Sequence, residues 1–214
     1  MRMHGSIRLA TAIALIGICG LLVAQGWTIV RFSLATMNVG SPEKRADIAE
    51  TWGTTPGLAA SALRAVLADK IDIADQKAAN QQREALSAIL SIKPLSPRDW
   101  LSFSGVQFVT DQPMDDVLES LKLSTLAGPN EGYVMVERGI YGVSLWESLS
   151  PDLKSRVAKD LLPLLFPRTP AEGAEAGKLQ ALVSAQPQRV RRELREALLA
   201  TGVSANDIEQ RLGL

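Results

Sequence analysis

Few residues in this sequence could form a catalytic site, and their spacing suits none. The 214-residue chain has one histidine, His4, and one cysteine, Cys19. Histidine-based triads, histidine general bases and most zinc sites are therefore excluded from the rest of the chain. Ser102, Ser104 and Ser144 have no nearby histidine in the sequence to activate them and no G-x-S-x-G motif around them. The sequence predicts no catalytic residue.

A group of four carboxylates is the best candidate for a cation site: Asp111, Asp115, Asp116 and Glu119. The group lacks the ligand spacing of an EF-hand loop and the glycine at its turn. Acidic residues in the first turn of a helix complement the helix dipole, so we interpret the group as a solvated helix start. Residues 128–132, GPNEG, lack the Gly-Lys-Ser/Thr ending of a phosphate loop and favour a turn between helices. We predict neither a metal nor a cofactor.

The densest basic patch lies near the C-terminal end, where four arginines are interleaved with Glu193 and Glu196: Arg189, Arg191, Arg192 and Arg195. Such a patch could bind an acidic polysaccharide, an anionic lipid surface or an acidic partner protein. The alternative is a solvent face with ion pairs at i to i+3 and i+4, such as Arg192 to Glu196. The chain has 23 basic and 23 acidic residues, which argues against a nucleic-acid partner.

Three tryptophans beyond the N-terminal segment, Trp52, Trp100 and Trp146, could stack on sugar rings through their flat apolar faces. Each lies among apolar residues at helical spacing, which favours packing in a core or between helices. We retain Trp100 and Trp146, together with the four arginines, as possible partner-binding residues.

An uncharged apolar run at residues 9–30 lies between Arg8 and Arg31. As a helix it would span roughly 33 Å at about 1.5 Å per residue, enough to cross a hydrocarbon core of about 30 Å. Trp27 suits the aromatic belt at the far interface. The competing interpretation is a cleaved signal peptide, because residues 24–26, AQG, have the small residues of a cleavage site. The run exceeds the usual apolar stretch of about 7–15 residues, which favours a retained anchor.

The charges that flank this run are nearly balanced. Arg2 and Arg8 precede it, whereas Arg31, Lys44 and Arg45 follow it. A short basic leader, residues 1–8, commonly stays in the cytoplasm. We therefore predict a single-pass protein of the inner membrane whose soluble domain is periplasmic. The alternative orientation places that domain in the cytoplasm, with its basic C-terminal helix against anionic lipid.

Helix start and stop signals recur along the rest of the chain, and strand-like alternation is scarce. Residues 132–136 and 139–143 could be short strands, but the helical spacing around them favours a helix. We predict an all-α fold in which residues 41–165 form an antiparallel helical domain. Residues 166–177, rich in Pro, Gly, Ala and Glu, are predicted to be a flexible connection. Residues 178–214 are predicted to form two short helices that pack separately.

Part of the predicted domain repeats after 35 residues: Glu84, Leu86 and Pro94 correspond to Glu119, Leu121 and Pro129, with Trp100 and Met135 six residues beyond each proline. The stretch 85–108, ALSAILSIKPLSPRDWLSFSGVQF, resembles a tetratricopeptide repeat, whose period is about 34 residues. With Trp100 aligned, Ser104 occupies the position where that pattern expects glycine. The resemblance implies stacked helical hairpins that bind other proteins.

The overall layout also looks like small accessory proteins of bacterial exopolysaccharide and surface-polysaccharide assembly, including the stretch 128–153, GPNEGYVMVERGIYGVSLWESLSPDL. This resemblance implies a scaffold or regulator and assigns no catalytic residue. We therefore expect a membrane-anchored, non-catalytic interaction protein that contacts the lipid bilayer and envelope proteins. The alternative is a periplasmic carbohydrate-binding module, or a carboxylate-dependent enzyme, that uses exposed tryptophans.

Overall fold

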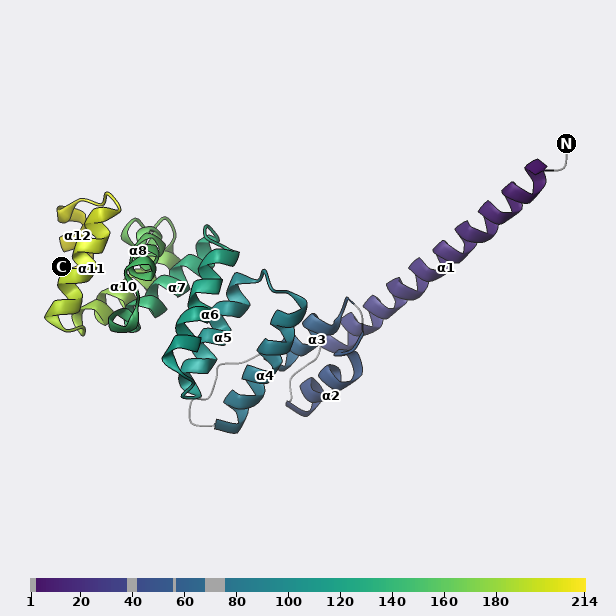
Figure 1. The fold of residues 1–214 in the computed structure, drawn as a ribbon, viewed down its shortest axis with the longest axis horizontal. Coiled ribbons are helices and arrows are strands. Elements are labelled where there is room, and N and C mark those ends of the chain that lie inside the picture. The colour runs from purple at the N-terminus through teal and green to yellow at the C-terminus, as the bar shows by residue number, and fades with distance from the viewer. Residues whose placement is uncertain (1–2, 38–41, 56, 68–75) are drawn as a thin grey trace. The chain divides into compact units, whose positions relative to one another are not determined.

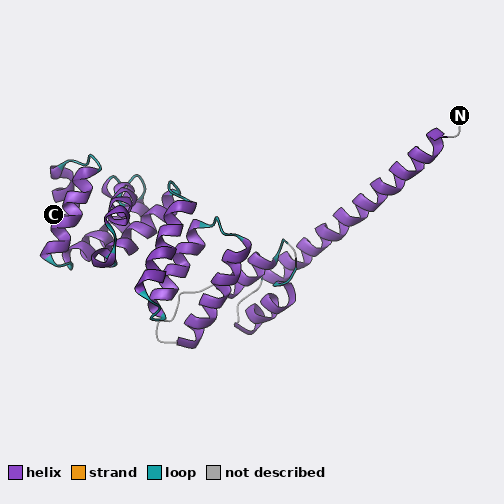
Figure 2. Cartoon of the chain, in the orientation of Figure 1, coloured by secondary structure: helices purple, strands orange, loops and turns teal. Residues whose placement is uncertain are grey.

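The computed structural model describes residues 3–37, 42–55, 57–67 and 76–214. Every regular element in these ranges is a helix, as Figures 1 and 2 show. The chain divides into two compact units, Met1–Lys70 and Ile71–Leu214. The all-α prediction is confirmed for the described residues. The predicted domain at 41–165 is wrong at both ends, because residues 41–70 belong to the first unit and the second continues to Leu214.

The first unit begins with the long helix α1, Met3–Thr36, which extends beyond the predicted span at both ends. Within it, Gly17–Thr36 is apolar, and none of its residues whose burial the structure describes is buried. By its length and composition, this part of α1 is able to cross a membrane. A signal sequence has the same properties near an N-terminus, so helix geometry alone does not distinguish a retained anchor from a cleaved one.

A short hairpin completes the first unit: α2, Pro42–Trp52, and α3, Ala59–Val66. Ile48 of α2 and Ala62 of α3 are buried between the two helices. Gly53 follows the last residue of α2, and a Cβ there would lie 2.3 Å from the backbone oxygen of Ala49. Only glycine fits this turn.

The second unit contains nine α-helices and one 3-10 helix in its described part. They are α4 (Gln76–Ile92), α5 (Pro97–Val109), α6 (Met114–Ala127), α7 (Gly132–Ser144), η1 (Trp146–Ser148), α8 (Pro151–Asp160), α9 (Leu162–Leu165), α10 (Pro170–Ser184), α11 (Gln188–Ala200) and α12 (Ala205–Leu212). The helix predicted across the two possible strands is confirmed by α7.

One apolar core runs through this unit from α5 to α12. Its fully buried side chains include leucines and an isoleucine of α6, α8–α9 and the three C-terminal helices: Leu121, Leu161, Leu164, Leu179, Leu194, Leu198 and Ile208. Helix α11 packs on α8, and α12 packs on α10. The prediction that residues 178–214 pack separately is therefore wrong, because their apolar faces complete the common core.

Residues 166–177 are not a flexible connection either. Helix α10 begins at Pro170, and a reciprocal capping box caps its N-terminal end. The Thr169 hydroxyl accepts from the Glu172 N–H at 3.2 Å, and the Glu172 carboxylate accepts from the Thr169 N–H at 3.1 Å. Alanine and glutamate favour helix, so the cap and the burial of Leu179 outweigh Gly173 and Gly177.

Helices α7 and α8 approach each other closely because glycines face the second helix. A Cβ at Gly142 would lie 2.4 Å from Cγ2 of Val157, and one at Gly139 would lie 2.8 Å from Cδ2 of Leu161. This contact brings the C-terminal half of α8 against α7.

Candidate interaction surface

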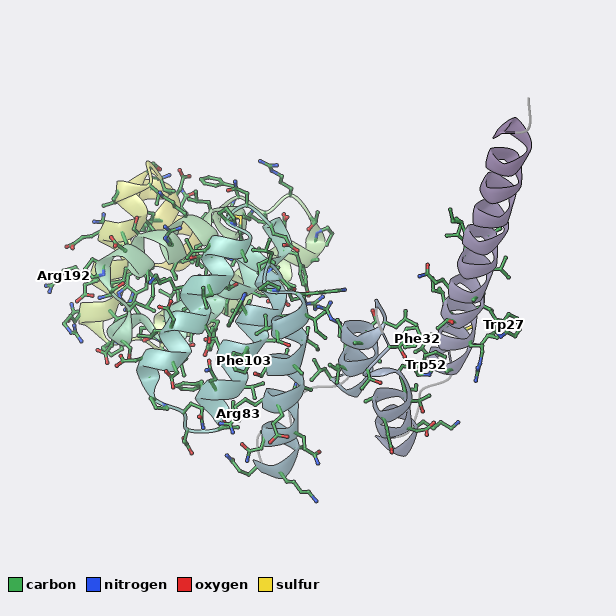
Figure 3. All side chains as sticks on the ribbon, turned by 45° about the vertical axis from the view of Figure 1, so that its right-hand side comes forward. Trp27, Phe32, Trp52, Arg83, Phe103 and Arg192 are labelled. Carbon is green, nitrogen blue, oxygen red and sulfur yellow. The ribbon has the colours of Figure 1, made fainter. Side chains whose placement is uncertain are left out.

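The four predicted arginines lie together on the surface of the second unit. With Gln188 and Leu214 they line a hollow of about 600 Å³, here called the arginine hollow: Arg189, Arg191, Arg192 and Arg195. Helix α11 positions them because Val190, Leu194 and Leu198 on its opposite face are fully buried. Figure 3 labels Arg192 at this end of the chain.

Protein groups already neutralise one arginine of the hollow. Arg189 forms ion pairs with Glu147 and, at 3.1 Å, with Glu193. The Glu193 carboxylate also accepts from Lys154 Nζ at 2.7 Å and from the indole N–H of Trp146 at 3.3 Å. The hydrogen bond from Lys154 is the main cause that lowers the pKa of Glu193. Glu193 therefore stays ionised at neutral pH and joins α11 to η1 and α8.

The other three arginines keep unused binding capacity. Arg191 donates from Nη2 to the backbone oxygen of Gly213 at 2.7 Å, and its buried Nε has no hydrogen-bond partner. Within the described ranges, neither Arg192 nor Arg195 has a carboxylate within 4.0 Å. The expected pair between Arg192 and Glu196 is thus wrong. Exposed pairs gain little energy against side-chain entropy, and the i to i+4 pair that forms is Arg189 to Glu193.

The helix itself adds to this positive charge. Arg189 and Arg191 lie in the first turn of α11, which contains no acidic residue. The positive end of the helix dipole lies in this turn. Acidic residues would offset it, whereas the two arginines add to the positive charge. Guanidinium groups bind carboxylate and phosphate oxygens through two parallel hydrogen bonds. The arrangement is therefore suited to holding an anionic group.

The two candidate tryptophans lie apart from this hollow. Trp146 is 1% exposed and belongs to the core, with Lys154 Nζ 5.5 Å from its ring centre. Trp100 on α5 is half-buried, donates to the Pro94 oxygen at 2.7 Å and meets Phe103 edge-on at 6.2 Å. The packing interpretation is confirmed for Trp146, whereas Trp100 lies outside the buried core and contacts Phe103 of its own helix. The proposed use of Trp146 as an exposed sugar-stacking face is wrong, because its ring is covered.

Backbone hydrogen bonds and a helix start account for the serines and carboxylates that were considered as catalytic or metal-binding candidates. Ser104 is buried and donates to the Val117 oxygen at 2.7 Å, and Ser144 donates to the Tyr141 oxygen at 2.6 Å. Asp115 and Asp116 are exposed in the first turn of α6, as expected of a solvated helix start. No cluster of three His, Cys, Asp or Glu side chains suited to a metal ion occurs among the residues that the structure describes.

A buried ion pair that the sequence analysis missed lies between α7 and α8. Arg138 donates from Nε to Asp160 Oδ2 at 2.6 Å, and both side chains are almost fully buried. Burial raises the pKa of Asp160, and the hydrogen bond from Arg138 opposes that rise. The pair lines a second hollow of about 550 Å³ together with Arg156 and Lys159. The sequence indicates this burial only through the position of Arg138, which lies four residues after Val134 and therefore on the apolar side of its helix.

Comparison with known proteins gives no family for this chain. No family model, curated protein or solved structure matches it. Pro94 and Pro129 do occupy equivalent places, between α4 and α5 and between α6 and α7. The tetratricopeptide arrangement and the kinship with polysaccharide-assembly proteins both stay predictions.

Proposed function

We propose that this chain is a membrane-anchored, non-catalytic interaction protein that holds a carboxylate-rich segment of a partner protein in its arginine hollow. The observation that carries the proposal is that Arg192 and Arg195 share one hollow without a carboxylate partner in the described chain. Residues that merely solubilise a helix face gain from being dispersed and paired. Here they converge on a helix fixed in the core.

Carboxylates fit this surface better than neutral sugar does. The residues that line the hollow include no aromatic side chain, so it offers no stacking face for a pyranose ring. Its guanidinium groups instead present planar forks that match carboxylate geometry. A partner segment with several acidic residues would contact more than one fork at once.

The anchor supplies the location in this proposal. Helix α1 provides the apolar length for a membrane span, and the resemblance to polysaccharide-assembly proteins suggests an envelope complex as the destination. Because a short basic leader commonly stays in the cytoplasm, we infer that the second unit lies in the periplasm. A reporter fused after Leu214 tests this orientation, because activity of a reporter that functions only in the cytoplasm would contradict it.

The binding proposal can be tested with a labelled oligo-glutamate peptide and the full chain in a non-ionic detergent. Arg192→Glu with Arg195→Glu should weaken binding about a hundredfold or more, since each of the two lost charge-assisted contacts costs on the order of 1.5–3 kcal/mol. The matched control is Lys122→Glu with Lys178→Glu, two exposed lysines on α6 and α10. Equal weakening in both variants, or none in the first, would overturn the proposal.

The same pair of variants identifies the natural partner. Envelope proteins crosslinked to the tagged chain in membranes should be lost with the α11 variant, retained with the control, and released by salt. Crosslinked proteins that are the same for both variants would mean that partners bind elsewhere.

A further inference from the structure

We propose that the α2–α3 hairpin and the adjoining turns of α1 form a collar in the headgroup layer of the bilayer. The hydrocarbon-spanning part of the anchor then ends near Gln25, not at Val30. The inference rests on the proposed anchor and adds a lipid-binding surface to it. The partner is the membrane interface itself.

Aromatic and cationic contacts hold the hairpin beside α1. The rings of Phe32 and Trp52 meet edge-on with centroids 5.9 Å apart, and the Arg31 guanidinium lies 5.8 Å from the Trp52 ring. Figure 3 shows Trp52 of α2 beside Phe32 of α1. These contacts place the C-terminal end of α2 level with residues 31–32 of the anchor helix.

The turn between α2 and α3 reaches further along the same helix. A hollow of about 470 Å³ is lined by α1 on one side and by the turn and the start of the hairpin's second arm on the other: Ala24, Gln25, Thr28, Ile29, Thr55, Gly57 and Leu58. The hairpin therefore lies alongside residues 24–32. Whatever surrounds the hairpin also surrounds that part of α1.

The hairpin cannot lie in hydrocarbon. Asp47 and Glu50 of α2 and Arg64 of α3 are exposed, and each charge in the bilayer centre costs about 2.5–3.5 kcal/mol or more. The described turn residues 53–55 and 57–58 are also non-helical, and lipid does not tolerate exposed backbone of this kind. Residues 24–32 must therefore lie at or beyond the edge of the hydrocarbon.

The part of α1 that precedes the collar is still long enough to cross the bilayer. Residues 7–25 of α1 would span roughly 28 Å at about 1.5 Å per residue, close to a core of about 30 Å. Arg8 lies near the end of this span, where a long cationic side chain can extend to the opposite interface.

The collar has the composition of an interfacial layer. Trp27 is 64% exposed, Trp52 is half-buried and Arg31 is exposed. Tryptophan prefers the headgroup level, and arginine is attracted to anionic lipid there. The exposed apolar side chains of Leu34 and Met37 continue this surface along α1.

Depth-dependent quenching tests the collar. In a Cys19→Ser background, an environment-sensitive fluorophore is attached at Thr54→Cys in the hairpin turn, Ile18→Cys in α1 or Ser87→Cys in α4, all exposed positions. The full chain is placed in phosphatidylcholine and phosphatidylglycerol vesicles that carry a nitroxide on the headgroup or deep in the acyl chain. We expect position 54 to lose most fluorescence with the headgroup nitroxide, position 18 with the deep nitroxide, and position 87 with neither.

Each departure from this pattern has one meaning. Quenching at position 18 without quenching at position 54 would overturn the collar and leave the anchor standing. Stronger quenching of position 54 by the deep nitroxide would also overturn it. No quenching at position 18 would overturn the anchor and the collar together.

Discussion

Arg138 and Asp160 form a buried two-point ion pair, in which Nε lies 2.6 Å from Oδ2 and Nη2 lies 3.0 Å from Oδ1. Nη1 of the same arginine donates to the backbone oxygens of Ser124 at 3.0 Å and Gly128 at 3.3 Å. One guanidinium thus joins the end of α6, the middle of α7 and the end of α8. Because α8 in turn contacts α11 through Lys154 and Glu193, this clamp supports the helix that bears the arginine hollow.

Asp160→Asn should destabilise the second unit by about 3–5 kcal/mol, because it leaves the Arg138 charge buried without a counter-ion. The exposed pair of Lys122 and Glu119 provides the control, and Glu119→Gln should cost less than about 1 kcal/mol. Urea unfolding of the full chain in detergent measures both values. Equal small losses would show that Arg138 does not depend on Asp160. Arg138→Met combined with Asp160→Leu should recover much of the loss, since no charge then stays buried.

Gly142→Ala should destabilise the contact between α7 and α8 by about 1–3 kcal/mol, because the added methyl would overlap Val157. Gly177→Ala, in α10, is the matched change: its Cβ would meet nothing within 4 Å. That variant should instead be stabilised by about 0.5–1 kcal/mol through better helix propensity. Thermal unfolding separates the two, and a neutral or stabilising effect at Gly142 would contradict the observed close packing.

Leu198→Ala tests whether α11 belongs to the common core. Leu198 is 0% exposed whereas its neighbour Leu199 is 36% exposed. We expect a loss of about 2–5 kcal/mol for Leu198→Ala, within one cooperative transition of the second unit. The same change at Leu199 should cost clearly less. A separate early transition in the Leu198 variant would mean that the C-terminal helices fold as an independent module.

Glu193 should make a stability contribution that disappears in acid. Its pKa is lowered from the ordinary value of 4.5, so its contribution is present above that value and is lost as the pH falls through the lowered pKa. The difference in unfolding free energy between the parent chain and Glu193→Gln should therefore shrink on acidification below about pH 4.5. A difference that stays constant or grows in acid would show that the contact with Lys154 does not stabilise the ionised form.

Local signals predicted most of the helices. The acids at the start of α6 and the proline at the start of α8 are helix-start signals that involve only a few neighbouring residues. Ser204 caps α12 as its sequence indicates. Composition misled at residues 166–177, because helix α10 depends on its cap and on the burial of Leu179 against distant helices. The position of the domain boundary likewise depends on contacts that no local pattern contains.

The candidate surface was only partly predictable. Helical spacing predicted that the arginines of α11 share a face, but the hollow also needs Leu214. The choice of ion pairs depends on Glu147, which is 42 residues from Arg189 in the chain. Arg138 was missed because charged residues are usually assigned to solvent, and its partner Asp160 lies 22 residues away on another helix.

The anchor on which the proposed function rests can be tested directly by alkaline carbonate extraction of membranes, followed by intact mass measurement of the chain. A protein held by residues 7–25 stays in the membrane pellet and keeps its full-length mass. Release into the supernatant, or a mass shortened at residues 24–26, would contradict a retained membrane helix and with it the central claim.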